Sequence, residues 1–216
     1  MTIAELLFIA LFLGSSIVLI GAVIQLLRGK RRSTVHLLTT LTTIWITYFV
    51  VLVLVAAFSQ QRVLKMNEDL CFDEMCFAAV GAQVSTQLGT PGHAVKPVGD
   101  FLVVTIRVSS HSRGRTQREA ALWPLLWNGN RFYQPSAEGQ RAYAAEHGES
   151  PSLTSPLAPG QSLLSVQVYD VLRPSPPLAL VLDHGFTPGY FVIGESPILH
   201  KPTRIQLDPV QVIVDP

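Results

Sequence analysis

The sequence predicts two transmembrane α-helices followed by an all-β sandwich domain. Three observations lead to this fold class: two long uncharged apolar segments, a cluster of cations between them, and short alternating segments afterwards. Hydrophobic residues make up 48% of the 216-residue chain and charged residues 14%, which is too apolar for an ordinary soluble domain. We therefore expect a transmembrane helical hairpin over residues 1–62 and an extracytoplasmic sandwich over residues 63–216.

The two apolar segments are long enough to cross a bilayer. Residues 6–27 carry no charge, and residues 35–58 carry none apart from the titratable His36. At about 1.5 Å of rise per residue, each segment exceeds the roughly 30 Å of hydrocarbon that a membrane helix must span. A cleaved signal peptide is the alternative for the first segment. Its positive charge follows the apolar stretch instead of preceding it, so we favour a membrane helix.

The connection between the helices, residues 28–34, contains the residues that predict orientation. They are Arg28, Lys30, Arg31 and Arg32. Basic residues in short loops favour the cytoplasmic side of a membrane. We therefore expect a multi-pass protein of the bacterial cytoplasmic (inner) membrane, with the connection in the cytoplasm and the sandwich outside.

Small and polar residues indicate how the two helices contact each other. Residues 14–16, Gly-Ser-Ser, lie at about the same depth as Thr47 when counted from opposite ends. Small residues allow close approach of two helices, so we expect a tight antiparallel hairpin in which Gly14, Ser15 and Ser16 face the second helix near Thr47. Thr39, Thr43 and Thr47 form a ladder whose hydroxyls bond either to the neighbouring helix or, more commonly, back to the preceding turn.

The chain contains two cysteines, Cys71 and Cys76, which flank the acidic pair Asp73-Glu74. An extracytoplasmic position favours a disulfide, which requires Cα atoms within about 7 Å and therefore a turn, for which Asp73 is well suited. Two alternatives remain: free thiols, or a metal site that uses both thiolates with Asp73 or Glu74. Zinc usually takes further Cys or His ligands nearby, and the histidines are scattered singly. We favour the disulfide, which would stabilise the fold by roughly 2 kcal/mol.

Beyond residue 66, apolar and polar residues alternate in short segments, as in half-buried strands. Residues 101–109 place Leu102, Val104, Ile106 and Val108 on one face. In the preceding segment, the residues expected to share one face are Cys76, Ala78, Val80, Ala82 and Val84. A third alternating segment covers residues 163–169. Further strands are expected over residues 121–127, 131–134, 178–182, 189–193 and 204–207.

Turn and cap residues divide these segments. Asn128, Gly129 and Asn130 separate two strands and predict a hairpin, because Asn and Gly tolerate positive φ. Pro124 indicates an edge strand or a bulge. Residues 136–148 read as a short helix with Ser136 as its N-cap. Seven or so short strands with long Pro- and Gly-containing connections are typical of an immunoglobulin-like sandwich.

The order of five segments carries a resemblance to a known family. These are "LCFDEMCFAAVGAQV", "FLVVTIRVSS", "WNGNRFY", "LAPGQSLLSVQVYDV" and "VIGESPILHKPTRIQLD". The chain resembles bacterial extracytoplasmic immunoglobulin-like domains of unknown function, relatives of the mycobacterial secreted immunoprotective antigen. The hallmark strand of that family corresponds to Pro159, Gly160, Val166, Val168, Tyr169, Asp170 and Val171. The resemblance covers most of residues 70–208 and implies a sandwich fold without catalytic residues; the paired helices lie outside it.

No catalytic motif is present in the sequence. It contains no G-x-S-x-G, H-E-x-x-H or phosphate-binding glycine loop, and no basic stripe suited to nucleic acid. Four residues that could form a hydrolytic or metal site are not spaced to meet, so ordinary surface charge is the simpler interpretation: Asp170, Asp183, Glu195 and His200. We therefore expect no enzyme activity, no cofactor and no metal.

Two classes of function remain. We favour a membrane-anchored, non-enzymatic interaction or scaffolding module of the bacterial envelope. The alternative is an accessory or sensory subunit of a larger membrane transport or signalling complex. The expected partners are the lipid bilayer and another envelope or membrane protein, not nucleic acid. Two regions of the sandwich are candidates for contact with a partner. One is the loop over residues 109–118, with Arg113, Arg115 and Arg118, and the other is the hairpin tip, with Asn128 and Asn130. For the basic loop, an ordinary solvated connection between two strands is the simpler interpretation.

Overall fold

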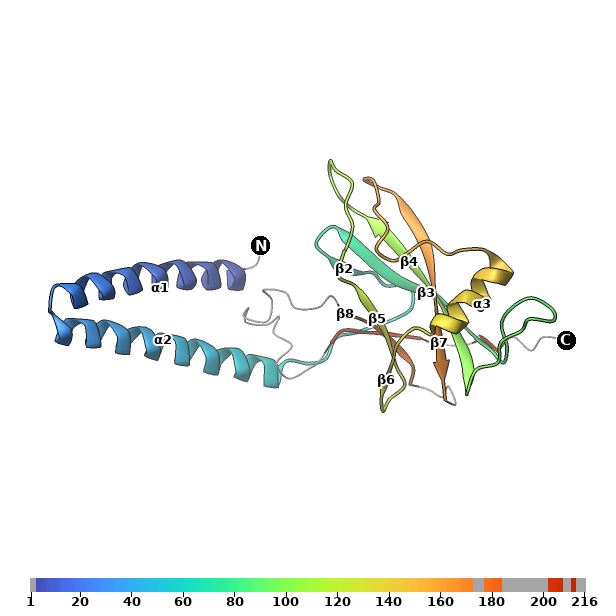
Figure 1. Ribbon diagram of the computed structural model, residues 1–216, viewed down its shortest axis with the longest axis horizontal. Coiled ribbons are helices and arrows are strands. Elements are labelled where there is room, and N and C mark those ends of the chain that lie inside the picture. Colours follow the sequence, from blue (N-terminus) through green and yellow to red (C-terminus); the bar gives the residue numbers. More distant parts are fainter. Residues whose placement is uncertain (1–2, 173–176, 184–201, 208–210, 213–216) are drawn as a thin grey trace. The chain divides into compact units, whose positions relative to one another are not determined.

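The structure is a computed structural model that describes residues 3–172, 177–183, 202–207 and 211–212. These residues divide into two compact units, one ending at Gln60 and the other beginning at Gln61. The first unit is a pair of α-helices and the second is a β-sandwich with one short helix (Figure 1).

The first unit is a helical hairpin made of α1 (Ile3–Leu27) and α2 (Arg31–Phe58). Three residues join the helices, fewer than the seven expected, because the cations Arg31 and Arg32 belong to the first turn of α2. Gly29 has a φ of 73° and ends α1. Its N–H donates to Leu26 O and the N–H of Lys30 donates to Gln25 O, both at 3.0 Å. This is a Schellman motif, which satisfies the last carbonyls of α1 and reverses the chain.

Ser15, one of the three small residues expected at the contact between the helices, joins α1 to α2. The indole N–H of Trp45 donates to Ser15 Oγ at 2.9 Å. Gly14 has no atom within 4 Å of the place where a Cβ would lie, and Thr47 is exposed. The predicted contact through residues 14–16 is therefore confirmed at Ser15, whose partner is Trp45, whereas the expected positions of Gly14 and Thr47 in it are wrong. Counting residues gives the depth of a position along a helix, but a shift of one residue turns it by about 100° around the axis.

The threonine ladder adopts the commoner of its two predicted arrangements. The hydroxyls of Thr39, Thr43 and Thr47 each donate to the carbonyl four residues earlier, at 2.9 Å. These bonds satisfy the hydroxyls within α2. The ladder therefore does not join α2 to α1.

The second unit contains two sheets of five strands. Their strands and the helix are β1 (Val63–Leu64), β2 (Leu70–Phe72), β3 (Met75–Ser85), β4 (Asp100–Ser110), β5 (Trp123–Trp127), β6 (Phe132–Tyr133), α3 (Ala137–His147), β7 (Ser162–Val171), β8 (Ala179–Asp183), β9 (Arg204–Gln206) and β10 (Gln211–Val212). One sheet has the order β1-β9-β8-β5-β6. The other has the order β10-β3-β4-β7, with β2 also pairing with β3. Every strand predicted within the described residues is present, and the prediction for residues 189–193 lies outside them.

The first part of strand β4 is buried on both of its faces. Leu102, Val104 and Ile106 face the core between the sheets, where they join Leu126 of β5 and Ile205 of β9. Phe101 and Val103 lie on the other face, in a second cluster with Val166 and Val168 of β7 and Ala142 of α3. The helix therefore covers part of the outer face of the sheet. Ser136 caps it as predicted, since its Oγ accepts from the N–H of Gly139 at 3.1 Å.

A bulge in β3 overturns the predicted alternation of that strand. Ala79 pairs with Ile106 and Gly81 with Thr105, which leaves Val80 as an extra residue. The residues of β3 in the core are therefore Met75, Phe77 and Ala79 before the bulge, and Ala82 and Val84 after it. Cys76 and Ala78 were expected to share a face with Ala82 and Val84 and lie on the opposite face. One inserted residue reverses the direction of every side chain beyond it.

The outer edge of β7 is covered by side chains from the segment around α3. The amide of Gln140 accepts from Val168 N at 2.9 Å and donates to Val166 O at 2.6 Å. Ser136 N donates to Val168 O, and Ser150 Oγ accepts from Val166 N, both at 2.7 Å. The edge groups of Val166 and Val168 are thus paired, which prevents another chain from adding to this part of the edge.

The sequence Tyr169-Asp170-Val171 at the end of β7 fixes the start of β4. The Asp170 carboxylate accepts from Val98 N at 2.9 Å and from Gly99 N at 3.1 Å.

The fully buried Tyr169 donates its hydroxyl to Pro124 O of the opposite sheet at 3.4 Å. Burial raises the pKa of Tyr169 above its usual value, so the phenol remains a donor. Pro124 itself lies in the part of β5 that β6 does not pair with, as expected for an edge position.

Replacing Gly99 by alanine should destabilise the sandwich. A Cβ at Gly99 would lie 2.2 Å from Val171 O, a backbone atom that cannot move without breaking the β4–β7 ladder. We expect Gly99→Ala to reduce the free energy of unfolding by roughly 1–3 kcal/mol in chemical denaturation. Gly114→Ala is the matched control, because a Cβ there meets no atom within 4 Å. Equal stability of the two variants would contradict the close approach.

Candidate functional site

A hairpin closed by a disulfide lies at one end of the sandwich. Cys71 of β2 pairs directly with Cys76 of β3, and their sulfurs are bonded, with the Cα atoms 3.9 Å apart. Asp73 begins the two-residue turn and has a φ of 51°, in the left-handed region. The structure thus adopts the arrangement that the sequence favoured over free thiols and a thiolate metal site. Among the residues that the structure describes, no group of three or more His, Cys, Asp or Glu could hold a metal ion.

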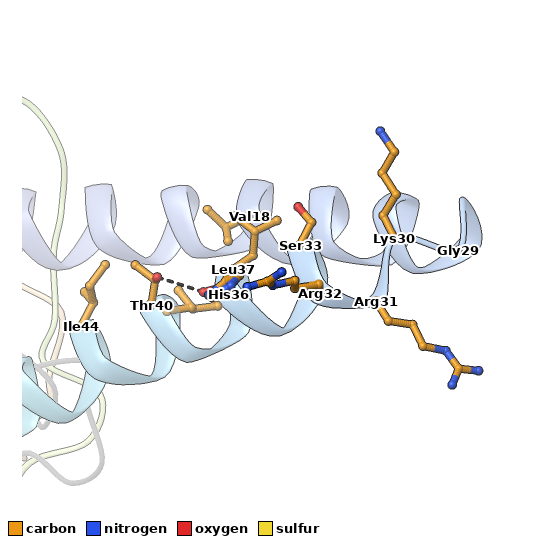
Figure 2. A pocket seen from close by; sticks show the side chains of 11 residues that line it. Val18, Gly29, Lys30, Arg31, Arg32, Ser33, His36, Leu37, Thr40 and Ile44 are labelled. Atoms are coloured by element: carbon orange, nitrogen blue, oxygen red, sulfur yellow. Dashed lines mark hydrogen bonds between the residues drawn. The ribbon is translucent and has the colours of Figure 1, made fainter.

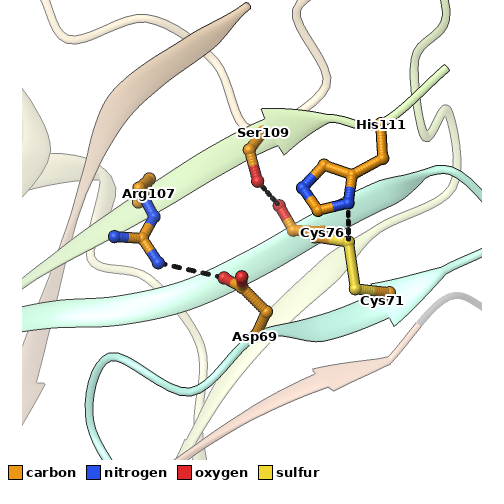
Figure 3. Close-up of polar contacts among 6 residues, drawn as sticks. All are labelled: Asp69, Cys71, Cys76, Arg107, Ser109 and His111. Atoms are coloured by element: carbon orange, nitrogen blue, oxygen red, sulfur yellow. Dashed lines mark hydrogen bonds and ion pairs between the residues drawn. A yellow bond between two sulfur atoms is a disulfide. The ribbon is translucent and has the colours of Figure 1, made fainter. Parts of the chain in front are cut away.

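Side chains from β4 and the residues after it surround this disulfide (Figure 3). His111 Nδ1 lies 3.9 Å from Cys76 Sγ, and Ser109 Oγ donates to Cys76 O at 3.5 Å. Cys71 is exposed, whereas Cys76 is 1% exposed. An Arg107–Asp69 ion pair at 3.1 Å lies beside them, about one-third exposed on both partners. A solvent-exposed ion pair of this kind contributes at most about 1 kcal/mol to the free energy of unfolding.

The disulfide hairpin supports the base of the basic loop over residues 111–118. The N–H of His111 donates to Glu74 O at 2.7 Å, and the side-chain amide of Gln117 donates to the Glu74 carboxylate. Gln117 also exchanges two backbone hydrogen bonds with Leu157. Inside the loop, the buried Ser112 donates its hydroxyl to Arg115 O at 2.8 Å. The base of the loop is therefore fixed in position.

This loop presents three exposed guanidinium groups, on Arg113, Arg115 and Arg118. Residues 111–118 contain no acidic residue, although residues 63–216 as a whole contain fourteen acidic residues and eleven Lys or Arg. The loop is thus a local positive region on an acidic domain. An acidic surface is the complementary binding partner for such a region.

The hairpin tip uses its first asparagine to form the turn. Asn128 Oδ1 accepts from Asn130 N at 3.2 Å and from Arg131 N at 3.1 Å, and Asn128 Nδ2 donates to Tyr133 Oη at 3.0 Å. The guanidinium of Arg131 stacks 4.4 Å from the centre of the Tyr133 ring. The exposed Asn130 is therefore the one of the two predicted contact residues whose side chain is not part of this arrangement.

The two candidate contact regions lie at opposite ends of the sandwich (Figure 1). Loop 111–118 comes after the end of β4, whereas a Cβ at Gly129 would lie 3.6 Å from Pro177, in the segment after β7. Strands β4 and β7 are antiparallel, and the end of β7 pairs with the start of β4. The loop and the hairpin tip therefore cannot form one binding surface.

The remaining predicted residues are dispersed. Arg28, Lys30, Arg31 and Arg32 are exposed at the turn of the helical hairpin. Asp170 holds the start of β4, and Asp183 is at the exposed end of β8. Glu195 and His200 lie outside the described residues.

Sequence reasoning missed the contacts of Glu74, Gln117 and His111. The sequence does contain one indication of these contacts, because His111 comes directly after a predicted strand. The sequence does not give the strand register that pairs Cys76 with Ser109, and the contacts depend on that register.

These features define a β-sandwich protein with two apolar N-terminal helices and a disulfide-closed hairpin. No protein-family model and no curated protein matches the sequence. The chain is similar in structure to a conserved hypothetical protein from Bacillus anthracis (18% identity, 57% of this chain and 92% of that chain covered, TM-score 0.47). It is also similar to an uncharacterised β-sandwich protein from Clostridium difficile (10% identity, 69% and 96% covered, TM-score 0.41).

A third similar structure is the secreted protein MPT63 from Mycobacterium tuberculosis (14% identity, 68% of this chain and 98% of that chain covered, TM-score 0.39). All three similar structures are therefore of bacterial proteins. The identities are below 25% and the TM-scores below 0.5, so the assignment as a sandwich rests on the two sheets and their shared core.

Removing the disulfide should lower the stability of the sandwich. Replacing both cysteines, Cys71→Ser with Cys76→Ser, should reduce the free energy of unfolding by roughly 2 kcal/mol, because a small loop is no longer closed in the unfolded chain. Denaturation with and without reductant measures this, and reductant should not affect the double variant. Peptide mass spectrometry after alkylation should find both cysteines protected in the unreduced wild type. Full alkylation without reductant would overturn the assignment.

Proposed function

We propose that this protein is a membrane-anchored, non-enzymatic interaction or scaffolding module of the bacterial envelope. Helices α1 and α2 cross the cytoplasmic membrane, with the turn at residues 28–30 in the cytoplasm. The sandwich, of immunoglobulin-like type, faces the outside. The observation that carries the proposal is the exposed apolar surface of the hairpin: only 11% of the most apolar part of each helix is buried in the structure.

An exposed apolar surface of this size requires a non-aqueous environment. Ile17 is 70% exposed, Ile20 62% and Phe49 55%, although all belong to well-formed helices. Water-soluble proteins rarely expose continuous apolar patches beyond a few hundred Å². The cations at the turn favour its cytoplasmic position. The Cys71–Cys76 disulfide agrees with an oxidising compartment for the sandwich.

The uses of the polar side chains support binding over catalysis. Asp170 and Gln140 pair with backbone groups of neighbouring segments, and Asn128 pairs with backbone groups of its own turn. Glu74 holds the base of the basic loop through Gln117. These groups therefore have structural partners that account for their positions in the sandwich.

The basic loop over residues 111–118 is the proposed contact surface. Its base is fixed by Glu74 and Ser112, so ordering it on binding costs little conformational entropy. Its three arginines suit an acidic face of another envelope protein. Only residues 59–62 separate α2 from β1, so the tether restricts partners to the membrane surface or to proteins standing on it.

The proposed orientation predicts opposite accessibility of two positions. We expect Ser152→Cys to react with a membrane-impermeant maleimide in intact cells, and Ser33→Cys to react only after the membrane is opened. Both residues belong to exposed segments, and the native cysteines are protected by their disulfide. Labelling of Ser33→Cys together with protection of Ser152→Cys would show that the topology is opposite to the proposed one.

Neutralising the basic loop should weaken capture of the partner. We expect the triple variant Arg113→Gln, Arg115→Gln and Arg118→Gln to lose most of the cross-linked product that the wild type forms in its native membrane, in a salt-sensitive manner. Arg131→Gln at the opposite end is the matched control.

Two results would contradict this proposal. Cross-linking that persists in the triple variant and maps to α1 or α2 would indicate an accessory subunit of a membrane complex. Turnover in a hydrolase screen of the purified protein would contradict a non-enzymatic role.

A further inference from the structure

A groove of about 870 Å³ lies on the helical hairpin beside its turn (Figure 2). Its walls are apolar: Val18 of α1 faces it together with Leu37, Leu41 and Ile44 of α2. Its mouth is basic, because it is lined by residues of the turn and of the first turn of α2. The groove therefore changes from positive to apolar along its length.

One cation of the mouth is directed into the groove. In Figure 2, the guanidinium of Arg32 runs along α2 toward His36, whereas Lys30 and Arg31 extend away from the helices. No acidic residue occupies the first turn of α2, and Lys30 makes no side-chain capping bond there. The positive end of the helix dipole thus adds to the charge of Arg32. An anion is the favoured occupant of the mouth.

The length of the groove indicates that its occupant also has an apolar tail. Arg32 and Ile44 are twelve residues apart on α2, which corresponds to about 18 Å along the axis. One leaflet of a bilayer has a hydrocarbon depth of about 15 Å. An occupant with an anionic head at Arg32 and an apolar tail of one leaflet's depth fits this length.

We infer that the groove binds one anionic phospholipid, with its phosphate at Arg32 and an acyl chain along Val18, Leu37 and Leu41. The inference rests on the proposed function, because a lipid reaches the groove only if the hairpin crosses the membrane. Charge complementarity selects an anionic head group, and the apolar walls select a lipid over free phosphate. The bound lipid holds the cytoplasmic end of the hairpin at a fixed depth.

Lipid retention by the full-length protein tests the inference. The protein is reconstituted in vesicles of phosphatidylcholine with phosphatidylglycerol, extracted in mild detergent and analysed by native mass spectrometry. The wild type should retain phosphatidylglycerol in preference to phosphatidylcholine. Arg32→Gln should reduce that retention about fivefold, the effect of one cation near a membrane surface. Arg62→Gln, outside the groove, is the control.

A second pair of variants separates the acyl site from the charge. Val18→Phe fills the apolar wall without changing any charge and should also reduce retention. Ile17→Phe is its control, because Ile17 is 70% exposed and does not line the groove. Equal retention by Val18→Phe and Ile17→Phe, or displacement of the lipid by inorganic phosphate, would overturn the lipid site.

The same vesicles distinguish failure of this inference from failure of the proposed function. Maleimide accessibility of Ser33→Cys and Ser152→Cys on opposite sides of the vesicle shows that the hairpin spans the membrane. Opposite accessibility with unchanged retention by Arg32→Gln would overturn the lipid inference alone. Accessibility of both positions from one side would overturn the spanning arrangement and the lipid site together.

Discussion

Strand β4 has a neighbouring strand on each edge and the main core on one face, and most of the sandwich is arranged around it. Its edges pair along almost their whole length with β3 and β7. One face meets the opposite sheet, and the first part of the other face, at Phe101 and Val103, meets α3. Buried backbone N–H and C=O groups cannot form hydrogen bonds with water, so each of them needs a hydrogen-bond partner within the protein. The close approach of Gly99 to Val171 and the hydrogen bonds to the Asp170 carboxylate fix the position at which β4 begins.

The need to pair buried or strand-edge backbone groups also explains several polar side chains, including Asp170 and Asn128, which were functional candidates in the sequence. Gln140 pairs with the free edge of β7, Asp170 with the amides before β4, and Asn128 with the amides of its own turn. The Tyr-Asp-Val sequence is thus a structural motif of the sandwich. The proposed contact surface, by contrast, consists of the three exposed arginines of loop 111–118, which take no part in these contacts.

The turn of the helical hairpin also satisfies its backbone groups within a few residues. The Schellman motif at Gly29 satisfies the backbone and shortens the connection to three residues. As a result, Arg32 lies on α2 instead of in a loop and is directed along the groove. The cations that indicate orientation and the cation that would hold a lipid are therefore members of one short sequence.

The sequence by itself determined the features encoded within a few residues. Helix length depends on two uncharged apolar segments, the α3 cap on Ser136, the β5–β6 hairpin on Asn128 and Gly129, and the disulfide on Cys71 and Cys76 near a turn. The tertiary structure decided the bulge at Val80, which reverses the faces of β3, and the choice of Ser15 over Gly14 as the contact with α2. It also decided that loop 111–118 and the hairpin tip lie apart. Register and helix rotation depend on packing between residues distant in sequence, and many registers share the same local periodicity.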